Sequence, residues 1–386
     1  MTPFAFNTTA GIRFGSAIAG TLGEIAGTRL GRSVLFITDA GLMKLGLCAP
    51  AIASLEQAGC AVTVFDAVEA DPSLATLMAA TDKARAMAAS GIVGFGGGSS
   101  MDVAKLAALL AGSGEDIDDA WGVGNAKGPR LPLILVPTTA GTGSEVTPVS
   151  IITVSGDEKR GVSSPVILPD LAILDPELTL GLPASITAAT GIDAMVHAIE
   201  AYASKSANNN AMSRMLAVEA LRLLGANIEM AVNEGSNIEA RSAMLLGSML
   251  AGMAFANSPV AAVHALAYPI GGIFHVPHGL SNALVLPHVL RFNAPEAAHL
   301  YAELAPHAFP GIDISAGAQG VCGEFIERLA GLSADLGLKT RLREVGVAET
   351  DLPRMAADAM KQTRLLVNNP RAVSEADALS IYKAAY

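Results

Sequence analysis

The most constraining feature of this chain is the segment SGIVGFGGGSSMDVAK, residues 90–105, in which an apolar run meets three consecutive glycines. The apolar run predicts a buried strand, and the residues after the glycines predict a helix that begins near Ser99–Asp102. Glycine lets the backbone approach a ligand closely, and the free N–H groups and dipole at a helix N-terminus attract phosphate. We interpret the segment as a pyrophosphate-binding loop. It is not the GxGxxG fingerprint with its later acid, and a glycine turn kept only for packing is the alternative.

The first 180 or so residues alternate short β-branched runs with alanine-rich stretches, which predicts βαβ units around a parallel sheet. Ligands of such sheets collect beyond the carboxyl ends of the strands. We therefore expect Asp39, Gly96–Ser99 and Thr138–Ser144 to be neighbours. The candidate strands are Val34–Thr38, Val62–Phe65, Gly91–Phe95 and Leu133–Val136.

A second loop, VPTTAGTGSEVTP at residues 136–148, follows the run LPLIL and is rich in hydroxyl side chains. An ordinary Ser/Thr/Gly turn is the alternative to a cofactor loop, but two such loops at neighbouring strand ends favour cofactor binding. Asp39 follows another candidate strand. Its carboxylate is placed either to accept from a ribose hydroxyl or to cap a helix.

Beyond Pro183 the strand signals fade, and Ala, Leu and Met recur at spacings of three and four residues, which predicts helices. A chain of 386 residues also exceeds the roughly 250–300 residues at which one core usually stops growing. The prolines and glycine of residues 174–183 mark the break. We predict an α/β domain over residues 1–182 and an all-helical domain over residues 183–386.

Composition excludes several classes of protein. The net charge of −11 comes without a Lys/Arg run, which argues against nucleic acid as a partner. Hydrophobic residues make up 51% and charged residues 16%, a surplus of apolar surface that suggests a homodimer or larger homo-oligomer. The apolar residues 251–274 contain two prolines, an asparagine and a histidine, so we read them as a buried helix pair and not as a membrane span.

The three cysteines are odd in number and lack CxxC spacing. This pattern argues against disulfides and against a thiolate metal site, and it suggests a reducing compartment. The N-terminus shows no basic segment followed by an apolar one, so no signal peptide is expected. A cytoplasmic location follows as an expectation.

GIDAMVHAIEAY, residues 191–202, places Asp193 and His197 at i and i+4 on a predicted helix, so both side chains share one face. Downstream, His264 and His278 lie in an apolar region, with His275 and His288 as further candidates. One carboxylate with several imidazoles suits Fe²⁺, Zn²⁺ or a similar divalent ion. Each histidine taken alone is as well explained as a satisfied core residue.

Four motifs carry a resemblance to a known family: GGGSSMDVAK, PTTAGTGSEVT, GIDAMVHAIEAY, and the segment from His264 through VPHGLSNALVLPHV. From about Phe14 to Leu379 the chain resembles the iron-containing, group III alcohol dehydrogenases, the family of lactaldehyde reductase and 1,3-propanediol dehydrogenase. The resemblance implies an N-terminal dinucleotide-binding α/β domain with a parallel sheet. It also implies an all-helical C-terminal domain and a catalytic metal in the cleft between the two.

Carried over motif by motif, the resemblance also implies roles for single residues. The metal ligands would be Asp193, His197, His264 and His278. Contacts to NAD would come from Asp39, Asp71, Gly97, Gly98, Ser99, Asp102, Thr138, Thr139, Thr142, Ser144, Thr147, Val149 and Leu178.

The chain departs from the family pattern at two positions. Tyr268 stands where many members have a histidine, which leaves proton transfer to Tyr268, His275 or another route. Gly161 stands where many members have a lysine, two residues after Lys159.

These observations predict a metal-dependent, NAD(H)-linked oxidoreductase that interconverts a small primary alcohol or diol and its aldehyde. A zinc enzyme of the same architecture, such as a glycerol dehydrogenase acting on polyols or a dehydroquinate synthase, is one alternative. A metal-dependent hydrolase is another, although it would have no use for two phosphate-binding loops. A non-catalytic nucleotide-binding protein would leave the buried carboxylate among the histidines unexplained.

Overall fold

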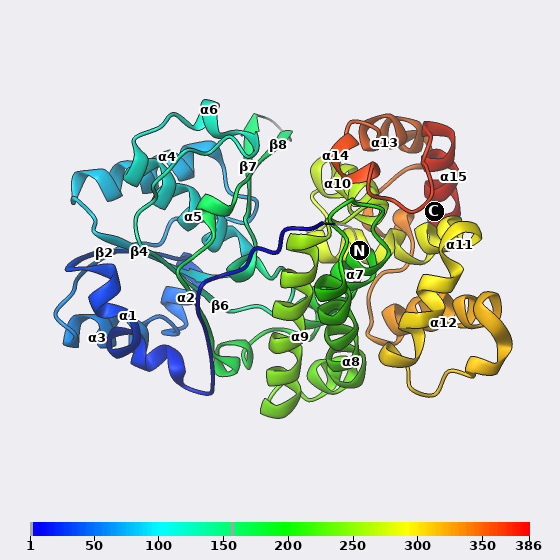
Figure 1. Cartoon of the computed structure of the whole chain (residues 1–386), viewed down its shortest axis with the longest axis horizontal. Helices are drawn as coiled ribbons and strands as arrows, with labels where there is room; N and C mark the ends of the chain where they lie inside the picture. The colour runs from blue at the N-terminus through cyan, green and yellow to red at the C-terminus, as the bar shows by residue number, and fades with distance from the viewer. Residues whose placement is uncertain (1–2, 156–157) are drawn as a thin grey trace. The chain divides into compact units, whose positions relative to one another are not determined.

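Six parallel strands form the main sheet in a computed structural model that describes residues 3–155 and 158–386 (Figure 1). The sheet order is β1-β9-β6-β4-β2-β3. Its strands are β1 (Ile12–Phe14), β2 (Ser33–Ile37), β3 (Ala61–Phe65), β4 (Gly91–Gly96), β6 (Leu133–Pro137) and β9 (Leu171–Leu174). The helices between them are α1 (Leu22–Leu30), α2 (Ala40–Lys44), α3 (Ala49–Gln57), α4 (Leu74–Ala86), α5 (Gly98–Ser113) and α6 (Ile117–Ala120).

A smaller sheet of three strands accompanies the main one, in the order β5-β8-β7. Strand β5 pairs parallel with β8, and β7 pairs antiparallel with β8. The bounds are β5 (Gly122–Val123), β7 (Val149–Ser155) and β8 (Glu158–Ser163). The four candidate strands of the sequence analysis are confirmed as β2, β3, β4 and β6, whereas β1, β9 and the smaller sheet were not expected.

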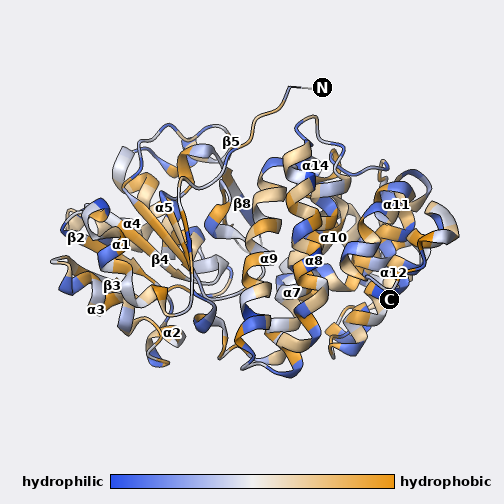
Figure 2. Cartoon of the chain, turned by 60° about the horizontal axis from the view of Figure 1, so that its bottom comes forward, coloured by the Kyte–Doolittle hydropathy of each residue, from blue (hydrophilic) through white to orange (hydrophobic). Residues whose placement is uncertain are grey.

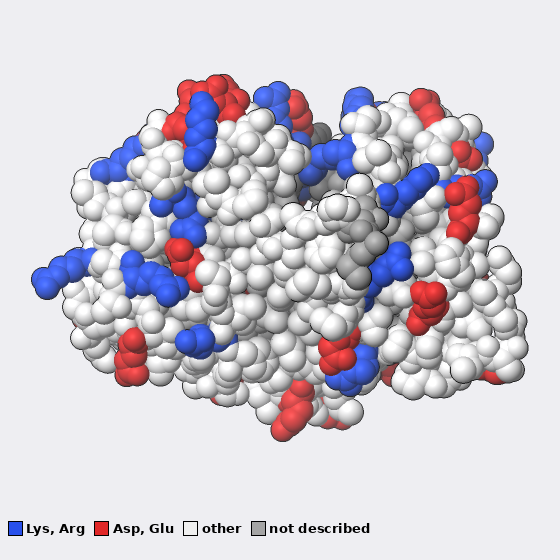
Figure 3. All heavy atoms as spheres, viewed as in Figure 1, with Lys and Arg blue, Asp and Glu red and all other residues white. Residues whose placement is uncertain are grey.

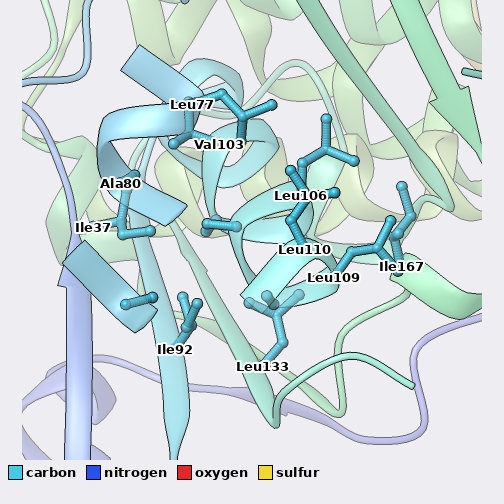
Figure 4. Close-up of a cluster of buried hydrophobic side chains, with 14 of the residues drawn as sticks. Ile37, Leu77, Ala80, Ile92, Val103, Leu106, Leu109, Leu110, Leu133 and Ile167 are labelled. Carbon is cyan, nitrogen blue, oxygen red and sulfur yellow. The ribbon is translucent and has the colours of Figure 1, made fainter. Parts of the chain in front are cut away.

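Successive side chains of each strand point to opposite faces of the main sheet. Helices cover both faces, so both sets of side chains are buried, as in other parallel sheets. Leu35 and Ile37 of β2 point to the face covered by α4 and α5, which Figure 4 shows in close-up. Val34 and Phe36 of the same strand point to the opposite face, covered by α1 and α3. Helix α5 is pressed onto the sheet at Gly94, where a Cβ atom would lie 2.6 Å from that of Ala104.

The second half of the chain is helical throughout, which confirms the expected fold class. Helix α7 is buried almost all round from Thr187 to Ala203, and α8 and α9 pack along it (Figure 2). Its helices are α7 (Ala184–Ala203), α8 (Ala211–Asn233), α9 (Ile238–Asn257), α10 (Ala262–Phe274), α11 (His278–Ala308), α12 (Gly317–Asp335), α13 (Leu352–Ala359), α14 (Thr363–Leu366) and α15 (Glu375–Ala385).

The chain divides into two compact units, which are described separately. One holds residues 7–139 and 143–180 and contains the sheets; the other holds residues 181–386 with residues 140–142 and the first residues up to Phe6. On the face that Figure 3 shows, acidic and basic side chains are interspersed among uncharged ones.

The expected helix pair over residues 251–274 is present as the end of α9 and α10, bent by 107°. Ala262 to Ala267 of α10 are all buried. Within the described ranges no single helix is long and apolar enough to cross a membrane, and only this bent pair passes a test of length and composition.

Candidate active site

Three helices of the helical unit bring four ligand side chains together. Asp193 and His197 lie one turn apart on α7, His264 lies in the first turn of α10, and His278 is the first residue of α11. One possible ligand atom of each lies within 4.8 Å of those of the other three. Asp193, His197 and His264 are buried, whereas the side chain of His278 is 41% exposed. The cluster is thus closed on three sides and open at His278.

Asn282 shows what kind of group this cluster suits. Its Nδ2 atom donates to Oδ1 of Asp193 at 2.6 Å and lies 3.3 Å from Nε2 of His264 and 3.2 Å from Nε2 of His278. Three acceptors therefore face one point, while Oδ1 of Asn282 is buried without a hydrogen-bond partner in the described structure. Converging oxygen and imidazole lone pairs fit a divalent cation such as Fe²⁺ or Zn²⁺.

The protonation of the cluster also fits a metal. Burial lowers the pKa of His197 to about 3, so this imidazole is neutral at neutral pH. Burial works to raise the pKa of Asp193, but the imidazoles of His197, His278 and His264 and the hydrogen bond from Asn282 outweigh it, so that the pKa is lowered. Metal ligation requires an ionised carboxylate and neutral imidazoles, and these pKa values favour those forms for Asp193 and His197.

Two of the histidines have a hydrogen-bond partner at the nitrogen that faces away from the cluster. Nδ1 of His197 lies 3.2 Å from the carbonyl oxygen of Gly141, and the His197 ring stacks on Phe255 at 4.4 Å between centroids. Nδ1 of His264 lies 2.7 Å from a carboxylate oxygen of Glu200, a buried residue that sequence reasoning missed. The signal was present in HAIEAY, because Glu200 follows Asp193 by seven residues, about two helical turns.

The two acid–base candidates lie on α10 and directly after it. Tyr268 lies four residues after His264, is half-buried, and has its ring centroid 6.1 Å from that of His278. His275 follows the last residue of α10 in a left-handed backbone conformation, with an exposed side chain. Among the residues that the structure describes, the cluster of four possible ligands contains neither His275 nor His288.

In the sheet-containing unit, the glycine-rich loop joins β4 to α5 as expected. Gly97 is the N-cap of α5, and the helix begins at Gly98, with Ser99 in its first turn. Gly96 has φ of 150°, a conformation that side chains rarely adopt. The backbone N–H groups of this first turn are not all paired within the helix, as at any helix N-terminus, and suit an anion.

The second loop lies against the first, because β4 and β6 are parallel neighbours in register at Gly96 and Pro137. The N–H of Thr138 donates to the carbonyl of Gly96 at 3.0 Å, and a Cβ at Gly97 would lie 3.7 Å from Oγ1 of Thr139. The expected neighbourhood of the two loops is therefore present. Thr142 belongs by its contacts to the helical unit.

The remaining part of the second loop is fastened to α5 by Lys105, another residue that sequence reasoning missed. Nζ of Lys105 donates to Oγ of Ser144 at 2.8 Å, to Oγ1 of Thr147 at 3.3 Å and to the carbonyl of Val149 at 2.7 Å. Ser144 in turn donates to Asp102 at 2.8 Å. Ser144 and Thr147 are buried, so this network holds the loop on its buried side.

Lys105 and Glu145 are buried in this network, and Asp102 is half-buried. Burial lowers the pKa of Lys105 to about 8, against the opposing charges of Asp102 and Glu145. Burial raises the pKa of Glu145 to about 7, and it raises that of Asp102 as well. The lysine signal was visible as the last letter of SSMDVAK, three residues after Asp102 and hence on the same helical face.

The other expected cofactor contacts have structural partners too. Asp39 is the N-cap of α2 and accepts from the N–H of Leu42 at 3.0 Å, the alternative role named above. Asp71 is exposed, has φ of 52° and pairs with Lys159 at 2.5 Å. Leu178 is 8% exposed and belongs to the core under α1 and α3.

An α/β unit with two glycine- and hydroxyl-rich loops, joined to a helical unit with an Asp–His₃ cluster, defines a metal-dependent oxidoreductase. The model of the iron-containing alcohol dehydrogenase family matches residues 9–176, and that of the C-terminal part of the Fe-containing alcohol dehydrogenase family matches residues 187–386. The chain therefore belongs to the iron-containing alcohol dehydrogenase family, a family of metal-dependent alcohol/aldehyde oxidoreductases, which confirms the resemblance.

Individual proteins show the same relationship over nearly the whole chain. Long-chain-alcohol dehydrogenase 1 of Geobacillus thermodenitrificans is 42% identical over 366 residues, covering 93% of this chain and 91% of that protein. The structure of a 1,3-propanediol oxidoreductase matches with a TM-score of 0.95, 36% identity and full coverage of both chains. Sulfoacetaldehyde reductase from Bifidobacterium kashiwanohense, solved in complex with NAD+, matches with a TM-score of 0.87, 30% identity and coverage of 100% and 99%.

Proposed function

We propose that this enzyme interconverts a small primary alcohol or diol and its aldehyde with NAD as the hydride carrier. One divalent ion, Fe²⁺ first and Zn²⁺ second, would be held by Asp193, His197, His264 and His278. The observation that carries the proposal is the convergence of these four ligand atoms within 4.8 Å of one another. One carboxylate and three imidazoles are the donor set that such ions take.

When bound, the ion would stabilise negative charge on the substrate oxygen as a Lewis acid, and NAD would accept or supply the hydride. The protein supplies orientation and a suitable local environment. Asp193 contributes the one negative charge among the ligands, so the site keeps an excess of positive charge toward the substrate. Phe255 lies against His197 and gives that side of the cluster an apolar wall, which excludes water.

The cofactor is assigned to the two loops of the sheet-containing unit. Gly98 and Ser99 would donate backbone N–H groups to the pyrophosphate, as helix N-termini commonly do. Asp39 would accept from a ribose hydroxyl and repel a 2′-phosphate, which favours NAD over NADP. The similar reductase solved with NAD+ supports this assignment.

We further propose residues 1–182 as the cofactor domain and residues 183–386 as the metal domain. A homodimer or larger homo-oligomer would cover part of the apolar surface noted above, and light scattering of the purified chain tests this. A cytoplasmic location is proposed on the cysteines, since Cys48, Cys60 and Cys322 are free and buried.

The decisive experiment combines metal analysis with a screen of short diols, 2-hydroxyaldehydes and primary alcohols, followed by the absorbance of reduced nicotinamide. We expect one ion per subunit and turnover that is lost on chelation. His278→Ala should remove most of the activity and leave the fold intact, because this ligand is partly exposed. A metal-stripped protein with full activity would refute the proposal, and product formation without any absorbance change would point to the hydrolase alternative.

A further inference from the structure

Glu200 makes three hydrogen bonds that converge from the start of α10. Its Oε1 atom accepts from the N–H of Val263 at 2.7 Å, and its Oε2 atom accepts from the N–H of Ala261 at 3.0 Å. The same Oε2 atom lies 2.7 Å from Nδ1 of His264. Both side chains are buried, at 5% and 4% exposure. One carboxylate on α7 thus holds both the backbone and the side chain of the segment that presents His264.

The partner of Nδ1 decides which nitrogen of His264 offers a lone pair. An ionised carboxylate has only acceptor positions, so the imidazole must donate its proton from Nδ1. In the neutral ring the other nitrogen, Nε2, then carries the lone pair. That nitrogen faces the cluster, 4.0 Å from Oδ1 of Asp193.

His264 differs in this respect from His197. Nδ1 of His197 faces the backbone carbonyl of Gly141 at 3.2 Å, a neutral acceptor at a longer distance. A hydrogen bond to a charged acceptor is shorter and about twice as strong as a neutral one. Glu200 therefore fixes its histidine more firmly than the carbonyl fixes His197, and it adds a negative charge beside the ligand ring.

We propose that Glu200 is a positioning residue of the metal centre: it holds His264 in the tautomer and orientation in which Nε2 binds the ion. The inference rests on the proposed function, since it assigns a role toward the ion proposed above. A carboxylate behind a ligating histidine raises the basicity of the ligand, so Glu200 strengthens metal retention. His264 would contact the ion directly, and Glu200 would act only through His264.

A purely structural role is the competing explanation, because the bonds to Ala261 and Val263 also satisfy N–H groups at the start of α10. The substitution Glu200→Gln separates the two roles. If its amide oxygen serves the Val263 N–H, its NH₂ group faces both the Ala261 N–H and Nδ1 of His264, and the ring must carry its proton on Nε2, the form that cannot bind a metal there. If the amide is turned over, its oxygen keeps Ala261 and His264, and its NH₂ group faces the Val263 N–H. In both orientations the negative charge behind the ring is removed.

The test measures the affinity of the full chain for Zn²⁺ by competition with a chelator, and the rate at which the zinc-loaded enzyme loses its ion. We expect Glu200→Gln to bind Zn²⁺ about 10–100-fold more weakly than the wild type. Glu303→Gln is the matched control, since Glu303 accepts from Tyr202 near the end of α7 and lies outside the metal-binding group. Asn237→Ala, which removes the N-cap of α9, controls for the loss of a helix cap.

A folded Glu200→Gln protein with wild-type zinc affinity would overturn the inference, as would an equal loss in both controls. A wild-type chain that retains neither zinc nor iron would overturn the proposed function and the inference with it. Should Glu200→Gln fail to fold, the ring nitrogen resonances of the chelator-stripped wild type decide the question. We expect His264 to carry its proton on Nδ1, and a proton on Nε2 would refute the role assigned to Glu200.

Discussion

The Nζ atom of Lys105 lies 2.8 Å from the hydroxyl oxygen of Ser144, and this buried contact ties α5 to the loop that follows β6. Both segments carry residues assigned to the cofactor. Because Lys105 also reaches the hydroxyl of Thr147 and the carbonyl of Val149, one cation fixes two points of the loop and the first residue of β7. The loop geometry thus depends on a residue whose charge is compensated by Asp102 and Glu145.

Lys105→Met should weaken both the fold and cofactor binding. The substitution leaves the half-buried carboxylate of Asp102 without its cation. Breaking a fully buried pair costs about 3–5 kcal/mol, and we expect a smaller loss here because the Asp102 side chain is 17% exposed. The free energy of unfolding in urea and the Kd of NAD by calorimetry measure the two effects. Lys127→Met is the control, because its side chain is 71% exposed. An unchanged Kd in a folded Lys105→Met protein would show that the loop does not need this fastening.

Glu145 should make stability fall as the pH rises. Burial raises the pKa of its carboxyl from 4.5 to about 7 in the folded chain, so the folded state holds a proton that the unfolded state has released. The stabilising contribution is complete below pH 4.5 and is lost as the pH passes through about 7. At 1.36 kcal/mol per pKa unit, it amounts to at most about 3 kcal/mol.

Glu145→Gln should remove this pH dependence. Its gain in stability over the wild type should be larger above pH 7 than at acidic pH, and the free energy of unfolding in urea across the pH range will measure it. The same substitution at exposed Glu229 controls for the loss of one negative charge. If the two variants gave parallel curves, the pH dependence would have to come from groups other than Glu145.

Much of the fold could be predicted because its signals are local. The strands β2, β3, β4 and β6 are apolar runs bounded by turn residues, and the helices of the second half show regular apolar spacing. Strand β1 has three residues, two of them exposed, which is too little pattern to detect. Strand β7 pairs with β8, and the polar strand β8 has no apolar run.

The cluster of Asp193, His197, His264 and His278 was visible for the same reason. Asp193 and His197 share a helical face, and the family motifs supplied His264 and His278. What the spacing did not reveal is the support behind these residues. Glu200, Asn282 and Lys105 have their roles only because segments far apart in the sequence pack together. For example, 64 residues separate Glu200 from His264. Such tertiary partners cannot be inferred from periodicity.

Asp39→Asn should relax the preference for NAD over NADP. The asparagine keeps an oxygen for the N–H of Leu42, so the cap of α2 survives while the charge is removed. We expect catalytic efficiency with NADP to rise about tenfold, since 1.4 kcal/mol of lost repulsion corresponds to that factor. Steady-state kinetics with both cofactors measure it, with Asp39→Gly as the companion variant. Equal efficiencies in the wild type would exclude Asp39 as the selector.

Tyr268 should tune proton transfer without being the indispensable acid or base. It lies on α10 four residues after His264, and its ring centroid is 6.1 Å from that of His278, at the open side of the cluster. A phenol has an unperturbed pKa of about 10, far from the neutral range in which a general base works best. The unperturbed pKa of a histidine is about 6.5.

Tyr268→Phe should therefore lower turnover by less than the roughly 10²–10⁴-fold of a full general acid–base contribution, with metal content and NAD affinity unchanged. Tyr268→His, which restores the residue of many family members, should add an ionisation near neutrality to the pH–rate profile. The measurements are the zinc content, the Kd of NAD and the dependence of the turnover rate on pH. If Tyr268→Phe abolished turnover while metal and NAD stayed bound, the hydroxyl of Tyr268 would itself be the catalytic acid, and the proton would pass through it.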